Sequence, residues 1–448
     1  MSETLEQSDL EKDCKEIQLG PKTVRIPHDW DVISLGNEEY AERTMGGTPD
    51  TDVNEYWGGN IPWMRSGELH KKHIKDVEER ISQEGKENSR AELIPEHSIL
   101  VGLNGQGKTK GTVAVNEIEL TTNQSVGAYL LNHEKLDHRY VFYSLESQYE
   151  VFRALAGGGR SGLNLQLLGQ MKVPYPPISE QCRIADILST VDDQIQQTDE
   201  IVTKTGELQR GVLNEVIPRG LNKQNKLRPS PEEDAELYEE VRRCTIPQQW
   251  EVSPLQDLCD EDVTYGIVQA GPHVEDGVPY IKTGDMTNDE LKIEELSRTA
   301  EEIAEDYSRS KVLAGELVMT IRATVGVVKQ IPPELAGANL TQGTARISPK
   351  DSIDNRYLLW AIRSNLVQSL IEARTKGSTF NEITLGALRK VPIPHPVNLD
   401  EQQRIAERID AVADKLQAEK SYLKKIKELK RGLMQDLLTG KVRVDPHN

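Results

Sequence analysis

Eight residues near the end of the first quarter of the chain match a phosphate-binding pattern. Residues 102–109 read GLNGQGKT, the G-x-x-x-x-G-K-T arrangement whose backbone N–H groups cradle nucleotide phosphates. Such a loop must open a helix, because the helix N-terminus supplies further N–H groups and a favourable dipole. The next residues, KGTVAV, instead predict a strand. We therefore expect a strand–turn–strand with a basic tip, and keep an NTP-using enzyme centred on Lys108 as the alternative.

Other catalytic patterns are missing from the sequence. There is no H-E-x-x-H, no G-x-S-x-G, and no NPPY or DPPY string of the kind that amino-methyltransferases use on a flipped base. The four cysteines, Cys14, Cys182, Cys244 and Cys259, share no metal-ligand or disulfide spacing. We predict no catalytic residue and no metal site in this chain, and a reduced, cytoplasmic setting.

Basic and amide side chains that could contact nucleic acid recur at corresponding places in the two halves of the chain. Arginine and lysine contact phosphates or guanine, amides can read adenine, and glycine lets a backbone approach a phosphate closely. Each residue alone is better explained by a solvated turn, but their recurrence makes a site an equally good explanation. The candidates are Arg65, Lys71, Lys72, Lys108, Lys110, Gln124, Arg160 and Asn164 in the first half, and Lys282, Arg322, Gln342, Arg374, Lys376 and Asn381 in the second.

These candidates sit within an internal repeat that covers most of the chain. The string IPHDW at 26–30 returns as IPQQW at 246–250, and EQCRIA at 180–185 returns as EQQRIA at 401–406. Near-constant offsets of about 220 positions indicate a duplicated architecture. Two alike domains can be related by a pseudo-twofold axis, which suits a partner with twofold character such as duplex DNA.

Each half predicts an irregular α+β domain, over residues 23–178 and 246–397. Short β-branched runs at 98–101, 111–115 and 316–320 predict strands, and helical spacing predicts helices at 137–154 and 355–373. Residues 1–22 are polar and acidic, so we expect a mobile tail there, with a second short tail at 441–448.

Each half closes with a long helix, predicted at 179–216 and 398–440. Apolar residues alternate at steps of four and three, which is typical of a coiled-coil seam. Helices of about 35 residues are about 50 Å long, and each is the simplest partner for the other, the alternative being that each packs on its own domain. Residues 217–245 are rich in proline and charge and predict a linker. The seam residues are Ile184, Leu188, Val191, Ile195, Val202, Leu208, Ile405, Ile409, Val412, Leu416, Leu423 and Ile426.

The composition is that of a polar globular protein with an acidic balance. The chain has 448 residues, 36% hydrophobic and 28% charged, and a formal net charge of −19. No apolar run approaches the length of a membrane span. Nucleic-acid binders are usually basic, but binding needs only a locally basic surface. The acidity also suits a protein from a salt-loving organism. High salt would weaken contacts between the protein and DNA phosphates.

The ordered set of motifs, occurring twice, resembles the DNA specificity (S) subunit of type I restriction–modification systems over residues 23 to about 442. The resemblance rests on IPHDW and IPQQW, on IPWMRSGEL and VPYIKTGDM, and on HSILVGLNGQGKTKGTVAV against GELVMTIRATVGVVKQ. It also rests on VPYPPISEQCRIADIL against VPIPHPVNLDEQQRIAERI, and on the helix ends LQRGVLNEV and LKRGLMQDL.

The resemblance implies an α+β fold with two similar target-recognition domains, separated by an antiparallel pair of long coiled-coil helices. Each domain would read one half of a bipartite, asymmetric DNA site. The helices would dock two modification (methyltransferase) subunits, and restriction (translocase and nuclease) subunits would join the full complex. The chain itself would be non-catalytic, with S-adenosylmethionine, ATP and Mg²⁺ used by its partners in a DNA adenine methyltransferase and ATP-dependent endonuclease. A coiled-coil interaction protein without a DNA role is the remaining alternative.

Overall fold

The computed structural model describes residues 14–105, 109–156, 162–288, 290–377 and 381–444. The chain forms two compact units. Unit 1 is Met1–Asp199 with Ser421–Asn448, and unit 2 is Glu200–Lys420. Each long helix therefore contributes residues to both units.

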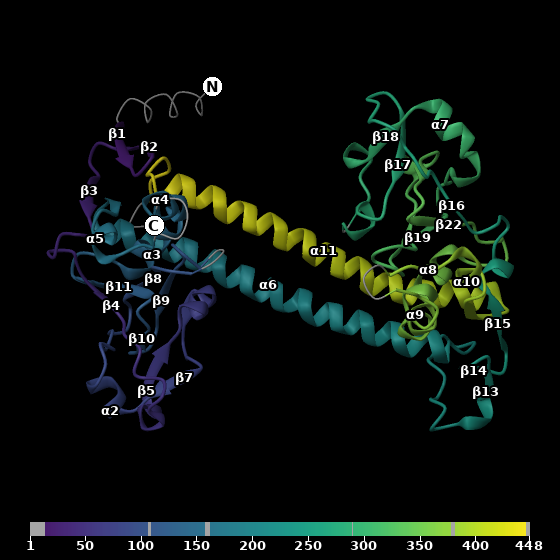
Figure 1. Ribbon diagram of the computed structural model, residues 1–448, viewed down its shortest axis with the longest axis horizontal. Coiled ribbons are helices and arrows are strands. Elements are labelled where there is room, and N and C mark those ends of the chain that lie inside the picture. Colours follow the sequence, from purple (N-terminus) through teal and green to yellow (C-terminus); the bar gives the residue numbers. More distant parts are fainter. Residues whose placement is uncertain (1–13, 106–108, 157–161, 289, 378–380, 445–448) are drawn as a thin grey trace. The chain divides into compact units, whose positions relative to one another are not determined.

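The centre of unit 1 is a five-stranded sheet next to a three-stranded sheet (Figure 1). The larger sheet has the order β4 (Ala41–Met45), β11 (Val126–Leu131), β8 (Ile99–Gly102), β9 (Val113–Asn116) and β6 (His73–Ile74). The smaller has the order β10 (Thr121–Thr122), β5 (Trp57–Met64) and β7 (Glu79–Ile81). Strands β8 and β9 are buried at every residue, which explains their continuous apolar runs.

Short helices complete unit 1. They are α2 (Gln83–Glu87), α3 (His138–Glu146), α4 (Tyr149–Leu155) and α5 (Leu165–Leu168). The single helix predicted at 137–154 is therefore two helices that break at residues 147–148. The Asp137 side chain caps α3 by accepting from the backbone N–H groups of Arg139 and Tyr140. Tyr140, Phe142 and Leu145 of α3 are buried in the core of the unit.

Unit 2 repeats this plan with shorter strands. Its four-stranded sheet has the order β16 (Thr264–Tyr265), β22 (Thr344–Ile347), β19 (Leu317–Thr320) and β20 (Val328–Gln330). Its three-stranded sheet has the order β18 (Ser297–Thr299), β17 (Val278–Ile281) and β21 (Asn339–Leu340). Its helices are α7 (Glu301–Asp306), α8 (Asn355–Arg363), α9 (Asn365–Glu372) and α10 (Leu385–Leu388). The parallel pair β17–β21 matches the parallel pair β5–β10 of unit 1. The sequence repeat is therefore also a repeat of the fold.

A short antiparallel strand pair closes each unit before its long helix. In unit 1, β3 (Asp31–Ser34) pairs with β12 (Lys172–Tyr175), and in unit 2, β15 (Trp250–Pro254) pairs with β23 (Pro392–Pro396). The first and last segments of each predicted domain thus lie side by side.

Two hairpins replace segments that we expected to be a tail and a linker. Strands β1 (Cys14–Leu19) and β2 (Lys22–Pro27) pair in unit 1, so the expected mobile tail is wrong for residues 14–22. Strands β13 (Tyr238–Val241) and β14 (Cys244–Pro247) pair within the expected linker 217–245. Leu221, Tyr238 and Cys244 are buried, and this burial holds the segment on unit 2.

The long helices are α6 (Ile178–Arg219) and α11 (Leu399–Leu437). In unit 1, Lys430 of α11 lies 2.8 Å from the carboxylate of Asp192 of α6, and Lys427 lies 3.9 Å from Asp199. Residue numbers rise along one helix as they fall along the other, so the two segments are antiparallel.

The same two helices pack together again in unit 2. The part of α6 near Val216 and the part of α11 near Ile405 share the hydrophobic core of that unit. A Cβ built on Gly206 would lie 4.0 Å from the side chain of Leu416. In unit 1 it is the start of α6, with Ile184 and Leu188, that shares a core with the end of α11 at Leu437.

All but one of the predicted seam residues are buried or half-buried. Leu208 is 56% exposed because it lies outside the seam. The heptad register of the seam continues through two polar residues instead. Thr198 and Thr205 are 4% and 6% exposed, so the next seam position after Thr205 is half-buried Gln209 rather than Leu208. Ile184, Leu188, Ile405, Ile409, Leu423 and Ile426 are buried, and Val191, Ile195, Val202, Val412 and Leu416 are half-buried.

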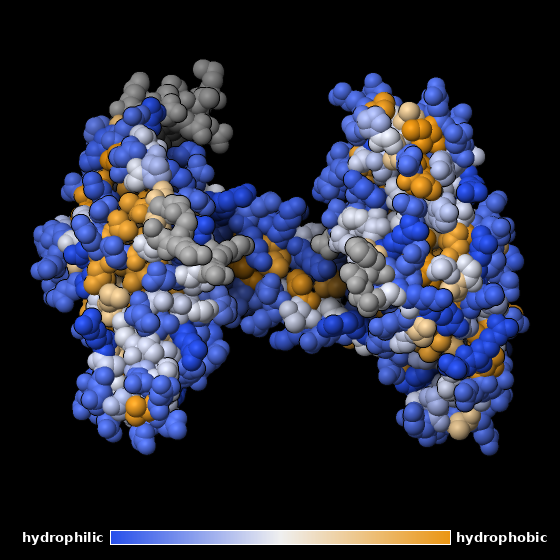
Figure 2. Space-filling model, in the orientation of Figure 1, coloured by the Kyte–Doolittle hydropathy of each residue, from blue (hydrophilic) through white to orange (hydrophobic). Residues whose placement is uncertain are grey.

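The surface is largely hydrophilic, with small apolar patches on the face seen in Figure 2. Within the described part of the chain, no helix has the length and apolar character needed to cross a membrane.

Candidate nucleic-acid interface

A glycine marks the same backbone crossing in both units. In unit 1, a Cβ on Gly46 would lie 2.0 Å from the carbonyl oxygen of Thr122, and in unit 2, a Cβ on Gly266 would lie 1.9 Å from that of Leu340. Only glycine allows so close an approach of two backbone segments. Two residues after each carbonyl comes a glutamine, Gln124 or Gln342.

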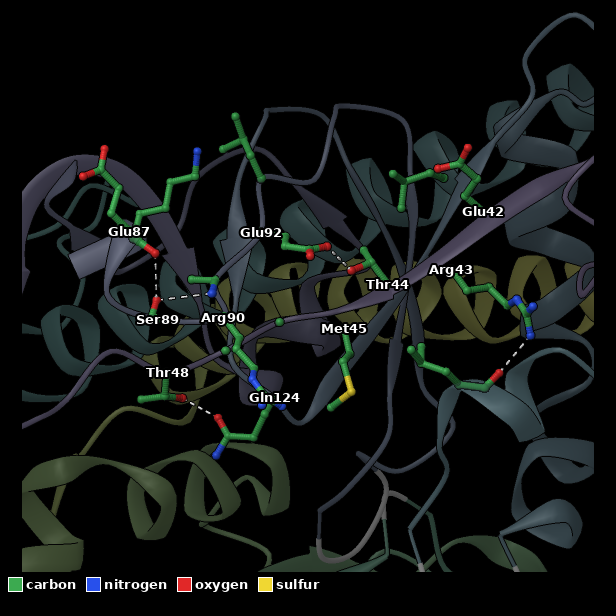
Figure 3. A pocket seen from close by; sticks show the side chains of 17 residues that line it. Glu42, Arg43, Thr44, Met45, Thr48, Glu87, Ser89, Arg90, Glu92 and Gln124 are labelled. Atoms are coloured by element: carbon green, nitrogen blue, oxygen red, sulfur yellow. Dashed lines mark hydrogen bonds between the residues drawn. The ribbon is translucent and has the colours of Figure 1, made fainter. Parts of the chain in front are cut away.

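In unit 1 this crossing forms one wall of a pocket of about 1130 Å³ (Figure 3). Its other walls come from β4 and residues 86–93. The Thr48 hydroxyl donates to the amide oxygen of Gln124, which orients the amide. Among the described residues, no acceptor is bonded to the Gln124 Nε2 donors, so they are available to a base acceptor.

The charged residues of the unit 1 pocket are mixed in sign. Arg43 donates from Nη1 to the carbonyl of Leu165 at 3.0 Å, and Glu92 accepts from the Thr44 hydroxyl at 2.6 Å. Arg90 is exposed, and in the described chain no carboxylate pairs with it. Arg90 and Gln124 both line the pocket, and their side chains overlap in the view of Figure 3.

In unit 2 the equivalent crossing borders a smaller pocket of about 430 Å³. Lys282, Arg322 and Gln342, three of the predicted contact residues, line it together. Lys282 Nζ donates to the Ser297 hydroxyl at 2.8 Å, and Arg322 Nε donates to the Glu382 carboxylate at 3.0 Å. Both cations are held in place at the rim but keep exposed charge, since the Arg322 side chain is 42% exposed.

Both units thus share the same glycine crossing of two backbone segments, but different side chains surround it in each unit. The profile of the family described as "Type I restriction modification DNA specificity domain" matches residues 27–204 and again residues 247–428. The chain belongs to this family.

Curated relatives match this specificity-domain chain over most of its length. The MjaVIII specificity subunit of a type I restriction enzyme from Methanocaldococcus jannaschii is 23% identical, and the match covers 94% of this chain and 95% of the relative. The EcoBI specificity subunit from Escherichia coli is 24% identical over 77% of this chain and 73% of the relative.

Solved structures show the same fold. The S subunit of a type I system from M. genitalium aligns with a TM-score of 0.57 at 15% identity, covering 94% of this chain and 98% of that one. A chain from a structure on assembly and conformational transition of the type I R-M system aligns with a TM-score of 0.55 at 18% identity, covering 93% and 99%.

Three predicted contact residues of the specificity-domain chain are engaged in ion pairs within unit 1. Both Arg65 Nε and Nη2 contact the carboxylate of Glu79, at 2.9 and 2.7 Å. Lys71 lies 2.6 Å from Glu68, and this hydrogen bond raises the pKa of the Lys71 ammonium. Lys72 pairs with a glutamate of α3. Their partners are 14, 3 and 74 positions away, so the sequence could not reveal the two distant pairs.

Other predicted residues have structural roles in the described structure. The Asn164 side chain caps α5 by accepting from the backbone N–H of Leu167 at 2.9 Å. Lys376 is joined to Glu382 by two backbone hydrogen bonds, of 2.8 and 2.9 Å. Asn381 is exposed and its carbonyl accepts from the backbone N–H of Ala323 at 2.9 Å. A role of these residues in DNA contact stays a prediction.

The remaining predicted residues lie outside the two pockets. Arg374 lines a separate basic pocket of unit 2, and Lys110 lies half-buried between β8 and β9. Lys108 and Arg160 lie outside the described residues. The side chains that sequence reasoning missed are Thr48, Lys86 and Arg90, for which the only signal was the glycine pair at 46–47.

The phosphate-loop alternative fails on local structure. The N–H of Gly102 donates to the Thr112 carbonyl and the N–H of Gly111 donates to the Gly102 carbonyl, both at 2.9 Å. Strand β9 then pairs antiparallel with β8. The phosphate-binding pattern at residues 102–109 is therefore followed by a strand and not by a helix. Over the described ranges, no group of three or more His, Cys, Asp or Glu side chains is arranged to hold a metal ion.

Proposed function

We propose that this chain is the sequence-specific DNA-binding subunit of a type I restriction–modification complex, in which each unit reads one half of a bipartite, asymmetric DNA site. The observation that carries the proposal is the repeated crossing with its glutamine. It presents Gln124 with Thr48 and Arg90 in unit 1, and Gln342 with Lys282 and Arg322 in unit 2. Different side chains on one frame would read different half-sites.

The long helices carry two equivalent apolar patches that suit two copies of one partner. On α6 within unit 2, Ile201 and Leu208 are 42% and 56% exposed, one heptad apart. On α11 within unit 1, Tyr422 and Leu429 are 44% and 54% exposed at the same spacing. Contiguous exposed apolar patches mark interaction sites, and the two side chains of each patch lie on one face of their helix. We infer that two modification subunits dock there, one on each patch.

Catalysis would then belong to the partners. The chain supplies sequence selection, while S-adenosylmethionine would be used by the modification subunits and ATP with Mg²⁺ by the restriction subunits. The names of the curated relatives, which are specificity subunits, support this division. The complex would work in the cytoplasm.

Co-expression with a type I modification subunit from the same source tests the proposal. We expect a complex with two modification subunits for each copy of this chain, and a footprint on DNA in two protected segments. A chain that binds no DNA in this complex would be a coiled-coil interaction protein instead. ATP binding by the isolated chain that is lost in Lys108→Ala would restore the NTP-using alternative.

A further inference from the structure

Four cations cluster in unit 2, and none of them is paired with a carboxylate of the described residues. Arg242, Arg243, Arg374 and Lys390 line a pocket of about 280 Å³ with Leu370, Ala373 and Pro392. The arginines 242 and 243 form the tip of the β13–β14 hairpin. Arg374 follows α9, and Lys390 lies two residues before the start of β23. Three separate segments of the chain thus converge to place positive charge at one point.

No ion pair within the described ranges involves these four side chains, although Glu240 and Glu372 lie close to them in sequence. Arg374 Nη1 donates to the carbonyl of Leu370 at 2.7 Å, which fixes its guanidinium but leaves its charge unpaired. This is unusual in a chain with a net charge of −19. Like charges that converge without counter-charge repel one another, and a bound anion would relieve that repulsion.

The backbone conformation of the hairpin tip is independent support for a function of these two arginines. Arg242 and Arg243 have φ of 51° and 70°, a left-handed conformation that two-residue hairpins normally assign to Asn-Gly or Gly-Gly. The corresponding hairpin of unit 1 has Gly20 at φ 58°. Backbone strain of this kind clusters at binding sites, where the strained side chains are needed.

We propose that this pocket binds an oxyanion, namely a backbone phosphate of the DNA duplex. This contact would add to the base contacts proposed for the other unit 2 pocket, which Gln342 lines. Guanidinium groups suit this role because they donate two parallel hydrogen bonds to one phosphate. Lys376, two residues after Arg374, is joined by backbone hydrogen bonds to Glu382, whose carboxylate holds Arg322 at the rim of the other unit 2 pocket. This inference rests on the proposed function, because it takes duplex DNA as the source of the phosphate.

The test is the salt dependence of binding of the full chain to a 30-base-pair duplex of arbitrary sequence. The variant Arg242→Asn/Arg243→Gly gives the turn its preferred residues, so its Tm should equal or exceed that of the parent. Each lost phosphate contact lowers the slope of log K against log salt by about 0.9. We expect a fall of at least that size for this variant.

The matched control is Lys223→Asn/Lys226→Asn, which removes two exposed lysines of the same unit and changes the net charge equally. Its slope should stay close to that of the parent chain. If the hairpin variant and the control lower the slope by the same amount, net charge alone acts and the proposal is wrong.

A second arm separates the sources of phosphate. Titration of the full chain with inorganic phosphate, followed by ³¹P NMR, should show binding that the hairpin variant loses and the control keeps. Phosphate binding with an unchanged duplex slope would mean a site for free phosphate, and would overturn the assignment to DNA. Loss of co-purification with the modification subunit at an unchanged slope would mean an acidic partner segment, and would also overturn it.

Failure of the proposed function looks different from failure of this inference. A chain without sequence preference in its assembled complex would still show the slope difference on an arbitrary duplex if the pocket holds a backbone phosphate. The slope experiment therefore reports on the pocket, and the footprint reports on the function.

Discussion

Arg228 and Glu401 form a buried ion pair across 173 positions of the chain. Arg228 Nη2 lies 3.1 Å from Glu401 Oε2, and Nη1 contacts the other carboxylate oxygen. The indole N–H of Trp250 and the backbone N–H of Leu221 also donate to that carboxylate, at 3.2 and 3.1 Å. One carboxylate thus fixes three segments of unit 2: the start of α11, the segment after α6, and the start of β15.

Unit 1 contains the same arrangement from different segments. Glu180 accepts from Trp30 at 3.1 Å and from Arg443 at 2.8 and 3.0 Å. Arg443 follows the end of α11, as Arg228 follows the end of α6. The expected terminal tail is therefore wrong for residues 441–444, because Glu180 and Asp29 hold Arg443 in place. The segment after each long helix completes one unit, which makes the helix pair part of both folds.

Glu401→Gln should destabilise the chain by about 3 kcal/mol or more, because it leaves the Arg228 charge buried without a partner. Arg228 is only 9% exposed. Glu180→Gln should cost clearly less, since Arg443 keeps two hydrogen bonds to Asp29 at 2.9 Å. Urea unfolding of the full-length variants measures both free energies. Equal losses, or a Glu401→Gln loss below about 1 kcal/mol, would contradict the role of this pair.

Three histidine rings in unit 1 predict a pH-dependent stability. His97 and His138 stack with ring centroids 4.3 Å apart, and His133 meets both edge-on. Burial, and then the neighbouring His97, lower the pKa of His138 to about 4, while Asp137 opposes this shift and Arg139 reinforces it. The unfolded side chain takes its proton near 6.5. Stability should therefore fall as the pH drops from about 6.5 towards 4.

The other half of the chain supplies the variant for this test. Unit 2 has Gly315 and Asn355 at the places of His97 and His138, and Asn355 donates to the Gly315 carbonyl at 2.7 Å. His97→Gly/His138→Asn should flatten the decline in Tm over that pH window. It should also relieve the left-handed backbone of His97, at φ 64°. An unchanged pH profile would show that these rings do not control it.

Gln342→Ala should reduce discrimination at one base pair of one half-site by about 1–3 kcal/mol, because a side-chain amide that reads a base edge is lost. Gln249→Ala, an exposed glutamine of the same unit outside the pocket, is the control and should change nothing. Competition binding of the assembled complex to single-base variants of its site measures the effect. A uniform loss of binding affinity across all variants of the DNA site would instead indicate that Gln342 contacts a phosphate.

Leu208→Glu should remove one modification subunit from the complex, and Leu429→Glu the other. Both side chains are more than half exposed, so neither change should lower the Tm of the chain. Ser421→Glu adds the same charge beside one patch while leaving its apolar side chains, and should leave the stoichiometry intact. Native mass spectrometry gives the count of subunits. Full assembly in the double variant Leu208→Glu/Leu429→Glu would place the partner elsewhere.

The repeat allowed much of the unit 2 site to be predicted. Lys282, Arg322 and Gln342 were found because equivalent segments carry polar residues in both halves, and the structure brings these three together. The unit 1 site was predicted less well. Thr48 bonds to Gln124 across 76 positions, and no local pattern links two such residues.

The helices show a similar division. Apolar heptad spacing predicts residues that are buried or half-buried in the helices, but it fails at Leu208, because the buried register continues through the polar residues Thr198 and Thr205. The hairpin at residues 238–247 was missed because its turn is Arg242-Arg243, which carries no turn signal.

Mapping of methylated bases in cells that express this chain with its modification subunit tests the central claim most directly. The account predicts one bipartite motif with two different half-sites. It also predicts that Gln124→Ala and Gln342→Ala each relax a different half while leaving the other unchanged. A single continuous motif, or two variants that relax the same half, would contradict the assignment of one unit to each half-site.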